Sequence, residues 1–166
     1  MIFRSAISIG LFSFLFILSA DAANNWCIGD SANPPCNGAP GKCTKNFDGS
    51  EGGFVADTAI VKQTGWLRSR NKPYIGLDVS ICDYAQVFGD ARVFGNVYIG
   101  GDARIYGNAR VYGNARVFGN AQVFGDARVF GDAWVCGLTR LYGDVQIAED
   151  TRLFGNDLIS TGNYGF

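Results

Sequence analysis

The sequence predicts an all-β fold in which short parallel strands wind into a single β-helix. Between Ala85 and Asn156 a six-residue unit, typified by Ala-Arg-Val-Phe-Gly-Asn, follows itself without a break. Six is not a helical period, and the unit alternates small apolar, polar, branched apolar and aromatic residues, as a strand does. Gly followed by Asn or Asp closes most units, and these residues tolerate the left-handed backbone of a tight corner. A repeat this regular decides the fold before any single motif does.

A chain of β-hairpins with two-residue turns is the alternative arrangement. In such a hairpin Phe88 would face Ala91 and Val87 would face Arg92, so each core valine would share its side of the sheet with an arginine. Stacking each strand on the equivalent strand of an earlier turn instead puts valine on valine and alanine on alanine. The repeat therefore favours parallel stacking with one consistently apolar side.

The unit carries a further signature, because an aliphatic residue is followed four residues later by a small one. The aliphatic position holds Val87, Val93, Ile99, Ile105, Val111, Val117, Val123, Val129, Val135, Leu141, Ile147 and Leu153. The small position holds Ala91, Val97, Ala103, Ala109, Ala115, Ala121, Ala127, Ala133, Thr139, Val145 and Thr151. In this signature the chain resembles the hexapeptide-repeat superfamily. The resemblance implies a left-handed β-helix of triangular section with three hexads in each coil, and about six coils between residues 54 and 159.

The N-terminal stretch 1–22 is typical of a secretory signal peptide. Arg4 supplies the positive end, an apolar run covers 6–18, and Ala20-Asp21-Ala22 suits cleavage before Ala23. The apolar run is short for a membrane span, although an uncleaved anchor helix is the alternative. We therefore expect a secreted or periplasmic protein, of bacterial type, with no stable membrane insertion after cleavage.

Residues 23–53 differ in kind and predict a small cysteine-rich cap. Cys27, Cys36 and Cys43 lie among prolines and glycines, a pattern that favours disulfides in an exported chain. Their spacings match no common zinc finger, so we expect no metal. Cys82 and Cys136 occupy the same hexad position three coils apart, about 14 Å, and cannot pair with each other. Either could pair with a cysteine of the cap or of a neighbouring subunit, and the disulfide candidates are Cys27, Cys36, Cys43 and Cys82.

The solenoid is expected to begin before the regular repeat. Val55, Val61 and Leu67 keep the six-residue step, and residues 68–74 would then form a corner loop before Ile75 resumes the count. The loop holds the basic cluster of Arg68, Arg70 and Lys72. These side chains are either simply solvated or form a contact for an anionic partner. Residues 160–166 are polar and rich in glycine, and we expect a C-terminal tail that ends the stack.

Catalysis is not expected, because the sequence contains no histidine. Resemblance to hexapeptide-repeat enzymes would imply a histidine base in the acyltransferases and three zinc-binding histidines in the carbonic anhydrases, and imidazole suits both tasks. Neither set of residues can be placed here, so we expect no cofactor. A divergent acyltransferase of the same fold is the enzymatic alternative.

The corner Asn and Asp residues also form files. One corner should stack Asp90, Asn108, Asp126 and Asp144, and another should stack Asn96, Asn114, Asp132 and Asp150. Adjacent carboxylates at coil spacing could share calcium. Local hydrogen bonds to the backbone are the favoured interpretation, because Asn and Asp commonly make them at tight turns.

The outer faces are the candidate site of binding or assembly. Strand alternation turns the residues that follow the alanine and the valine outward, in aromatic and arginine rows. The candidate residues are Phe88, Arg104, Tyr106, Phe124, Arg140, Tyr142, Arg92, Phe94, Arg110, Tyr112, Arg128, Phe130 and Trp134. Ladders that stiffen the coil are one interpretation, and stripes that mark an interface are the other.

Self-association is the nearest functional interpretation of these faces, and resemblance to the trimeric enzymes of the superfamily implies a trimer. A glycan or cell-surface ligand is the next, because exposed aromatic rings can stack on sugars. The net charge is only −1, with acids and bases interspersed, so no nucleic-acid partner is expected. The sequence thus predicts an exported, non-catalytic β-solenoid that serves as a rigid structural or binding element.

Overall fold

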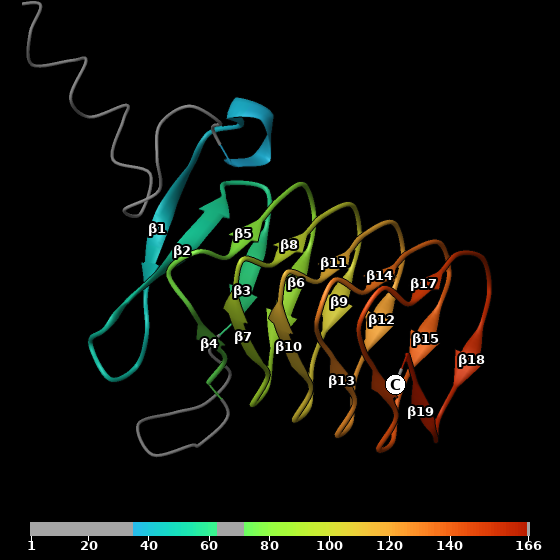
Figure 1. Ribbon diagram of the computed structural model, residues 1–166. Helices are drawn as coiled ribbons and strands as arrows, with labels where there is room; N and C mark the ends of the chain where they lie inside the picture. The colour runs from blue at the N-terminus through green and yellow to red at the C-terminus, as the bar shows by residue number, and fades with distance from the viewer. Residues whose placement is uncertain (1–34, 63–71, 166) are drawn as a thin grey trace, which may run out of the picture.

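The computed structural model describes residues 35–62 and 72–165, and in them the chain winds as a stack of turns with a sheet on each of three sides (Figure 1). Sheet A contains β1 (Gly41–Lys45), β2 (Glu51–Ala56), β5 (Ser80–Ile81), β8 (Tyr98–Ile99), β11 (Arg116–Val117), β14 (Trp134–Val135) and β17 (Arg152–Leu153). Sheet B contains β3 (Ile60–Lys62), β6 (Gln86–Phe88), β9 (Arg104–Ile105), β12 (Gln122–Val123), β15 (Arg140–Leu141) and β18 (Leu158–Ile159). Sheet C contains β4 (Tyr74–Ile75), β7 (Arg92–Gly95), β10 (Arg110–Gly113), β13 (Arg128–Val129), β16 (Gln146–Ile147) and β19 (Asn163–Tyr164). A 3-10 turn, η1 (Pro35–Gly38), precedes them.

The strands from β2 onward pair in parallel with the strand three positions later. Val111, for example, pairs with Val93 on one side and Val129 on the other, so equivalent hexad positions lie side by side. Each sheet has six such strands, which is about five turns from the first strand of a sheet to its last. The predicted parallel β-solenoid is therefore confirmed, and the hairpin alternative is wrong. The left-handed sense of the coil stays a prediction.

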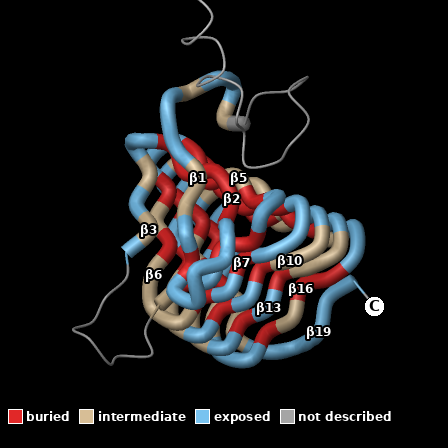
Figure 2. The backbone as a smooth tube through the Cα atoms, turned by 90° about the vertical axis from the view of Figure 1, so that its left-hand side faces the viewer, coloured by how far each residue is buried: buried red, intermediate tan, exposed pale blue. Residues whose placement is uncertain are grey.

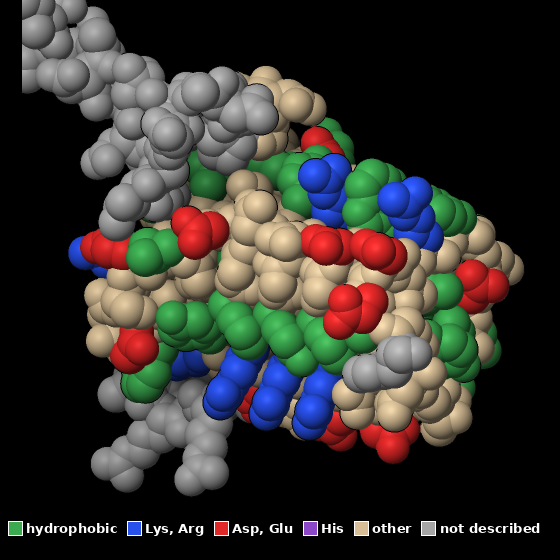
Figure 3. All heavy atoms as spheres, in the orientation of Figure 1, with side chains coloured by type: hydrophobic (Ala, Val, Ile, Leu, Met, Phe, Trp, Pro, Cys, Tyr) green, Lys and Arg blue, Asp and Glu red, His purple; other side chains and the backbone are tan. Residues whose placement is uncertain are grey.

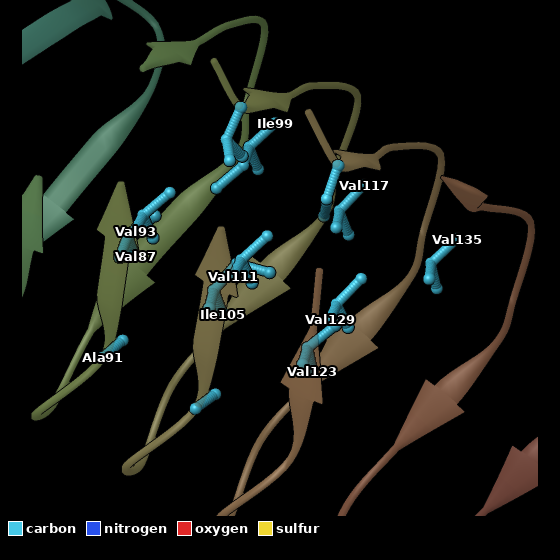
Figure 4. Close-up of a cluster of buried hydrophobic side chains, with 14 of the residues drawn as sticks. Val87, Ala91, Val93, Ile99, Ile105, Val111, Val117, Val123, Val129 and Val135 are labelled. Carbon is cyan, nitrogen blue, oxygen red and sulfur yellow. The ribbon is translucent and has the colours of Figure 1, made fainter. Parts of the chain in front are cut away.

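The core is a set of continuous apolar files inside the coil. From Val87 to Ile147 the aliphatic and small positions are buried while most of their neighbours are not, and the tube in Figure 2 alternates accordingly. Figure 4 shows Val93, Val111 and Val129 of sheet C pointing inward toward side chains of the other two sheets. Because β-branched side chains fill this narrow interior turn after turn, each coil buries its apolar side only when its neighbours are present.

The corners depend on glycine where successive turns touch. Gly113 has φ +78°, and a Cβ built on it would lie 2.9 Å from the backbone nitrogen of Gly131 in the next turn. The backbone amide of Asn114 donates to the carbonyl of Gly131 at 2.8 Å, which holds the two corners together. Glu149 follows Gly131 in this file and has φ 49°, so the left-handed corner is kept there without glycine. The repeated glycine therefore serves both a left-handed backbone and a close approach.

The N-terminal end is closed by the described part of the cysteine-rich segment. Strand β1 adds to the edge of sheet A as an antiparallel partner of β2. At the edge of sheet C, the buried Asn46 side chain takes the place of a strand. Its Nδ2 donates to the carbonyl of Ile75 at 2.8 Å, and its Oδ1 accepts from the amide of Ile75 at 2.8 Å. Both backbone groups of Ile75 are thus satisfied by one amide side chain.

A disulfide ties this segment to the second turn. Cys36 and Cys82 are bonded, with Cα atoms 5.2 Å apart and a sequence separation of 46. Cys82 therefore pairs with a cysteine of the cap, as one of the two alternatives expected. Cys43 is also disulfide-bonded, and Cys27 lies outside the described residues. Cys136 is a free, buried thiol.

The first turn departs from the predicted register. Val61 of β3 pairs with Val87, and Ile75 of β4 pairs with Val93, so Ile75 takes the hexad position that follows Val61. Leu67, which was predicted to hold that position, lies outside the described residues, as do Arg68 and Arg70. The prediction was wrong because Ile75 follows Val61 in the register, although the spacing from residue 61 to residue 75 exceeds one hexad.

The C-terminal stretch adds a strand where the sequence suggested a tail. Asn163 pairs with Gln146 and Tyr164 with Ile147, so β19 extends sheet C beyond residue 159. This pairing is 17 residues apart, one fewer than the regular spacing. Tyr164 is the register partner of the buried Ile147, and it is 39% exposed on this last strand.

Candidate interaction faces on the outside of the solenoid

The outer face of sheet B carries a column of stacked aromatic rings. Phe88, Tyr106, Phe124 and Tyr142 follow one another with ring centroids 5.0, 4.8 and 5.4 Å apart and planes within 11° of parallel. Each ring belongs to the residue after a core aliphatic residue, which the strand alternation turns outward. The predicted residues of this face are therefore brought together in one column.

A second column lies on the outer face of sheet C. Phe94, Tyr112 and Phe130 stack with centroids 5.1 and 4.9 Å apart, and their planes are within 6° of parallel. Such pairs stabilise a fold by about 0.5–1.5 kcal/mol each beyond the area that they bury. In both columns the flat face of an inner ring is covered by its neighbours, so the ring edges point to solvent. The columns thus offer little ring face for a sugar to stack on.

Phe124 is an inner ring of the sheet B column, and its replacement tests how much ring stacking contributes to stability. We expect Phe124→Ala to lower the free energy of unfolding by about 2–4 kcal/mol, because it removes two ring contacts and leaves a gap between Tyr106 and Tyr142. Phe154→Ala is the matched control, since Phe154 is 57% exposed and has no ring contact among the described residues. Urea denaturation followed by circular dichroism measures both. Equal losses in the two variants would show that the column adds no stability.

The face of sheet A is irregular, as expected, and centres on Trp134. Arg116 and Arg152 are its register partners, and their guanidinium carbons lie 4.9 and 5.2 Å from the indole ring. Phe118 meets the same indole edge-on, with the centroids 6.2 Å apart. The two arginines of this face are therefore engaged in cation–π contacts within the chain.

On the other two faces the outward arginines form vertical files, and the two files differ in whether glutamine separates the arginines. On sheet B, Arg104 and Arg140 are separated by Gln122, so glutamine and arginine alternate. On sheet C, Arg92, Arg110 and Arg128 follow one another without interruption. On the side that carries β7, β10 and β13, Figure 3 shows a row of three basic side chains beside a hydrophobic stripe.

A shallow groove runs beside the arginine file of sheet C. Its lining residues are Lys72, Asp90, Arg92, Asn108, Arg110, Asp126 and Arg128. A similar groove beside the file of sheet B is lined by Asp102, Arg104, Asn120, Gln122, Leu138, Arg140 and Asn156. Each groove follows a corner, where a file of Asn and Asp faces a file of Arg and Gln.

The corner side chains bond between turns, which the sequence interpretation missed. Asn108 donates through Nδ2 to Asp126 Oδ1 at 3.0 Å, and Asn114 donates likewise to Asp132 Oδ1 at 2.8 Å. Local backbone bonds had been expected at these four positions, and that expectation was wrong for them because their register partners lie within reach. Among residues 35–62 and 72–165, no three potential metal ligands gather in one place.

Burial favours the neutral form of two titratable groups on these faces, the Tyr106 hydroxyl and the Cys136 thiol. Burial raises the pKa of the Tyr106 hydroxyl, while the nearby Arg140 and Arg104 oppose that rise. Burial also raises the pKa of the Cys136 thiol, whose sulfur lies 3.5 Å from the carbonyl oxygen of Leu153. A thiol that stays protonated is a poor nucleophile, so Cys136 is a packing residue in this environment.

The repeat geometry finds a counterpart among known families. Residues 85–101, 103–117, 109–123 and 121–137 match a family model described as the YdcK beta solenoid repeat. This part of the chain is a beta-solenoid repeat. Comparison with curated proteins and with solved structures gave no match. The matched residues lie on all three sheets and include most of both aromatic columns.

Proposed function

We propose that the protein is an exported, non-catalytic structural element that makes contacts through the outer faces of a rigid solenoid. The observation that carries this proposal is the stacking of outward side chains in register, ring on ring and arginine on arginine, across successive turns. Parallel sheets with stacked side chains resist bending and present the same groups at a fixed spacing. Repetition of this kind suits a scaffold or an extended contact surface.

Export is part of the proposal. The signal-like stretch 1–22 and the Cys36–Cys82 disulfide support a secreted or periplasmic, bacterial location, because structural disulfides persist in oxidising compartments. Within the described ranges the structure contains no helix long and apolar enough to cross a membrane. The hexad signature supports kinship with the hexapeptide-repeat superfamily and a left-handed coil.

Self-association is supported by exposed apolar side chains near the last turns. Leu138, Phe154 and Leu158 are 54%, 57% and 66% exposed. The amide of Leu138 bonds to the carbonyl of Gly155, next to Phe154, and Leu158 is the register partner of Arg140. These side chains therefore gather at the corner between sheets A and B, and burying them against a second copy would remove apolar surface from water.

Sedimentation velocity over a range of protein concentrations tests the self-association. We expect the chain to associate, and we expect Leu138→Ser with Leu158→Ser to weaken the association about tenfold or more without altering the circular dichroism spectrum. Leu77→Ser is the matched control, because Leu77 is 41% exposed but lies in the first turns. A chain that stays monomeric at every concentration would overturn this part of the proposal.

A further inference from the structure

The arginine file of sheet C differs from every other outward file of the regular repeat. Arg92, Arg110 and Arg128 are direct register partners, all are exposed, and no other residue type interrupts them. On sheet B the equivalent arginines are spaced by Gln86 and Gln122. The same repeat thus separates its charges on one face and concentrates them on the next.

Among the described residues, no carboxylate forms a salt bridge with the arginines of this file. The single salt bridge among residues 35–62 and 72–165 joins Lys45 to Glu51, at 3.2 Å. Neighbouring arginines at coil spacing, about 5 Å, repel one another by about 1 kcal/mol in water. An anion between them would remove that repulsion and accept the guanidinium hydrogen bonds.

The groove beside the file combines charge with hydroxyl-binding groups. Four basic and two acidic side chains line it, and the carboxylates belong to Asp90 and Asp126. Asn108 adds an amide between them and bonds to Asp126. Lys72 lies at one end, where its Nζ also sits 3.7 Å from the centre of the Phe47 ring.

We infer that this groove binds an extended acidic polysaccharide, with successive sugar carboxylates lying along Arg92, Arg110 and Arg128. The carboxylates and amide of the corner would then accept and donate hydrogen bonds with the sugar hydroxyls. The inference gives a partner class to the proposed surface contact and rests on that proposal for its extracellular setting.

Two observations favour such a glycan over single-stranded nucleic acid. Proteins that bind single strands offer the faces of aromatic rings to the bases, whereas the rings of Phe94, Tyr112 and Phe130 cover one another. In addition, the carboxylates of Asp90 and Asp126 can accept hydrogen bonds from sugar hydroxyls, which a polyuronate carries on every ring and a DNA strand lacks along its length.

Titration of the purified chain with polygalacturonate oligomers, which carry one carboxylate per sugar, tests the site. We expect salt-sensitive binding that weakens about tenfold to hundredfold in a variant combining R92Q, R110Q and R128Q. Glutamine is a suitable replacement because Gln146 already follows Arg128 in this file. The matched control combines R104Q and R140Q on sheet B and should change the affinity less than threefold.

A variant that creates a second binding site provides a further test of the inference. Gln122→Arg would make three consecutive arginines beside the groove of sheet B, which already contains Arg104 and Arg140. We expect this variant to bind two polygalacturonate oligomers in place of one, by calorimetry.

Several results would overturn the inference. Unchanged affinity in the triple variant would do so, as would a loss of equal size in the sheet B control. Single-stranded DNA of matched charge should bind at least tenfold more weakly, and equal or tighter binding would contradict the assignment to a glycan. Loss of glycan binding with self-association intact would reject this site and leave the structural proposal standing.

Discussion

Val111→Asp should abolish the native fold. Val111 is fully buried in the middle of sheet C, between Val93 and Val129, and no basic side chain is buried among residues 35–62 and 72–165. The new carboxyl group would be buried either charged without a partner or protonated. Each alternative would lower the free energy of unfolding by more than about 4 kcal/mol. Because each coil is stable only against its neighbours, the loss should spread along the stack. Far-UV circular dichroism and the urea midpoint measure the effect.

Two controls separate burial from position in this experiment. Val111→Ile should change the free energy of unfolding by less than about 1.5 kcal/mol, since Ile75 and Ile147 already occupy the same file. Arg110→Gln, one residue away but outward, should leave the fold intact. A cooperative, native-like transition in Val111→Asp would mean that the side chain reaches water and that the inward files are misassigned.

Gly113→Ala should cost about 3 kcal/mol or more. The residue has φ +78°, a region that costs an L-residue about 1–2 kcal/mol, and the added Cβ would lie 2.9 and 3.0 Å from the backbone nitrogen and oxygen of Gly131. The backbone of Gly131 cannot move aside without opening the corner, so the strain adds to the conformational cost. Chemical denaturation of the purified variant measures the loss.

Gly49→Ala is the matched control for that substitution. Gly49 has a similar φ of +85°, but no atom lies within 4 Å of an added Cβ. It should therefore lose only the conformational part, about 1–2 kcal/mol. If the two variants lost the same free energy, close stacking of the corners would contribute nothing.

The regular repeat made much of this structure predictable. Because Val93 and Val111 differ by one complete coil, the period alone placed them side by side, and their outward neighbours followed by strand alternation. The stacked column from Phe88 to Tyr142 came from the same reasoning. The YdcK-type match agrees with the repeat, although the hexapeptide-repeat kinship itself stays a proposal.

Features outside the repeat were not predictable in the same way. Asn46 closes the edge of sheet C by bonding to Ile75, 29 residues away, and a lone asparagine in a cysteine-rich segment gives no signal of that role. Leu67 fitted the six-residue count, yet Ile75 takes the hexad position after Val61, so a match to the period alone did not identify the core residue.

The candidate site was predictable in composition but not in chemistry. The sequence identified the aromatic and arginine rows, yet parallel rings leave their edges outward, and only the structure shows that the ring faces are covered. The contrast between the alternating file of Arg104 and the continuous file of Arg110 is visible in the sequence. It became informative once the groove and the missing acidic partners were seen.

Nuclear Overhauser contacts between backbone protons test the central claim most directly, namely that residues one coil apart lie side by side. The structure predicts contacts that link Val93 with Val111 and Val111 with Val129, and likewise along the other files. It predicts none between Val87 and Arg92, which an antiparallel hairpin would bring together. Contacts of that second kind, with none at coil spacing, would contradict the stacked solenoid and every role assigned to its outer faces.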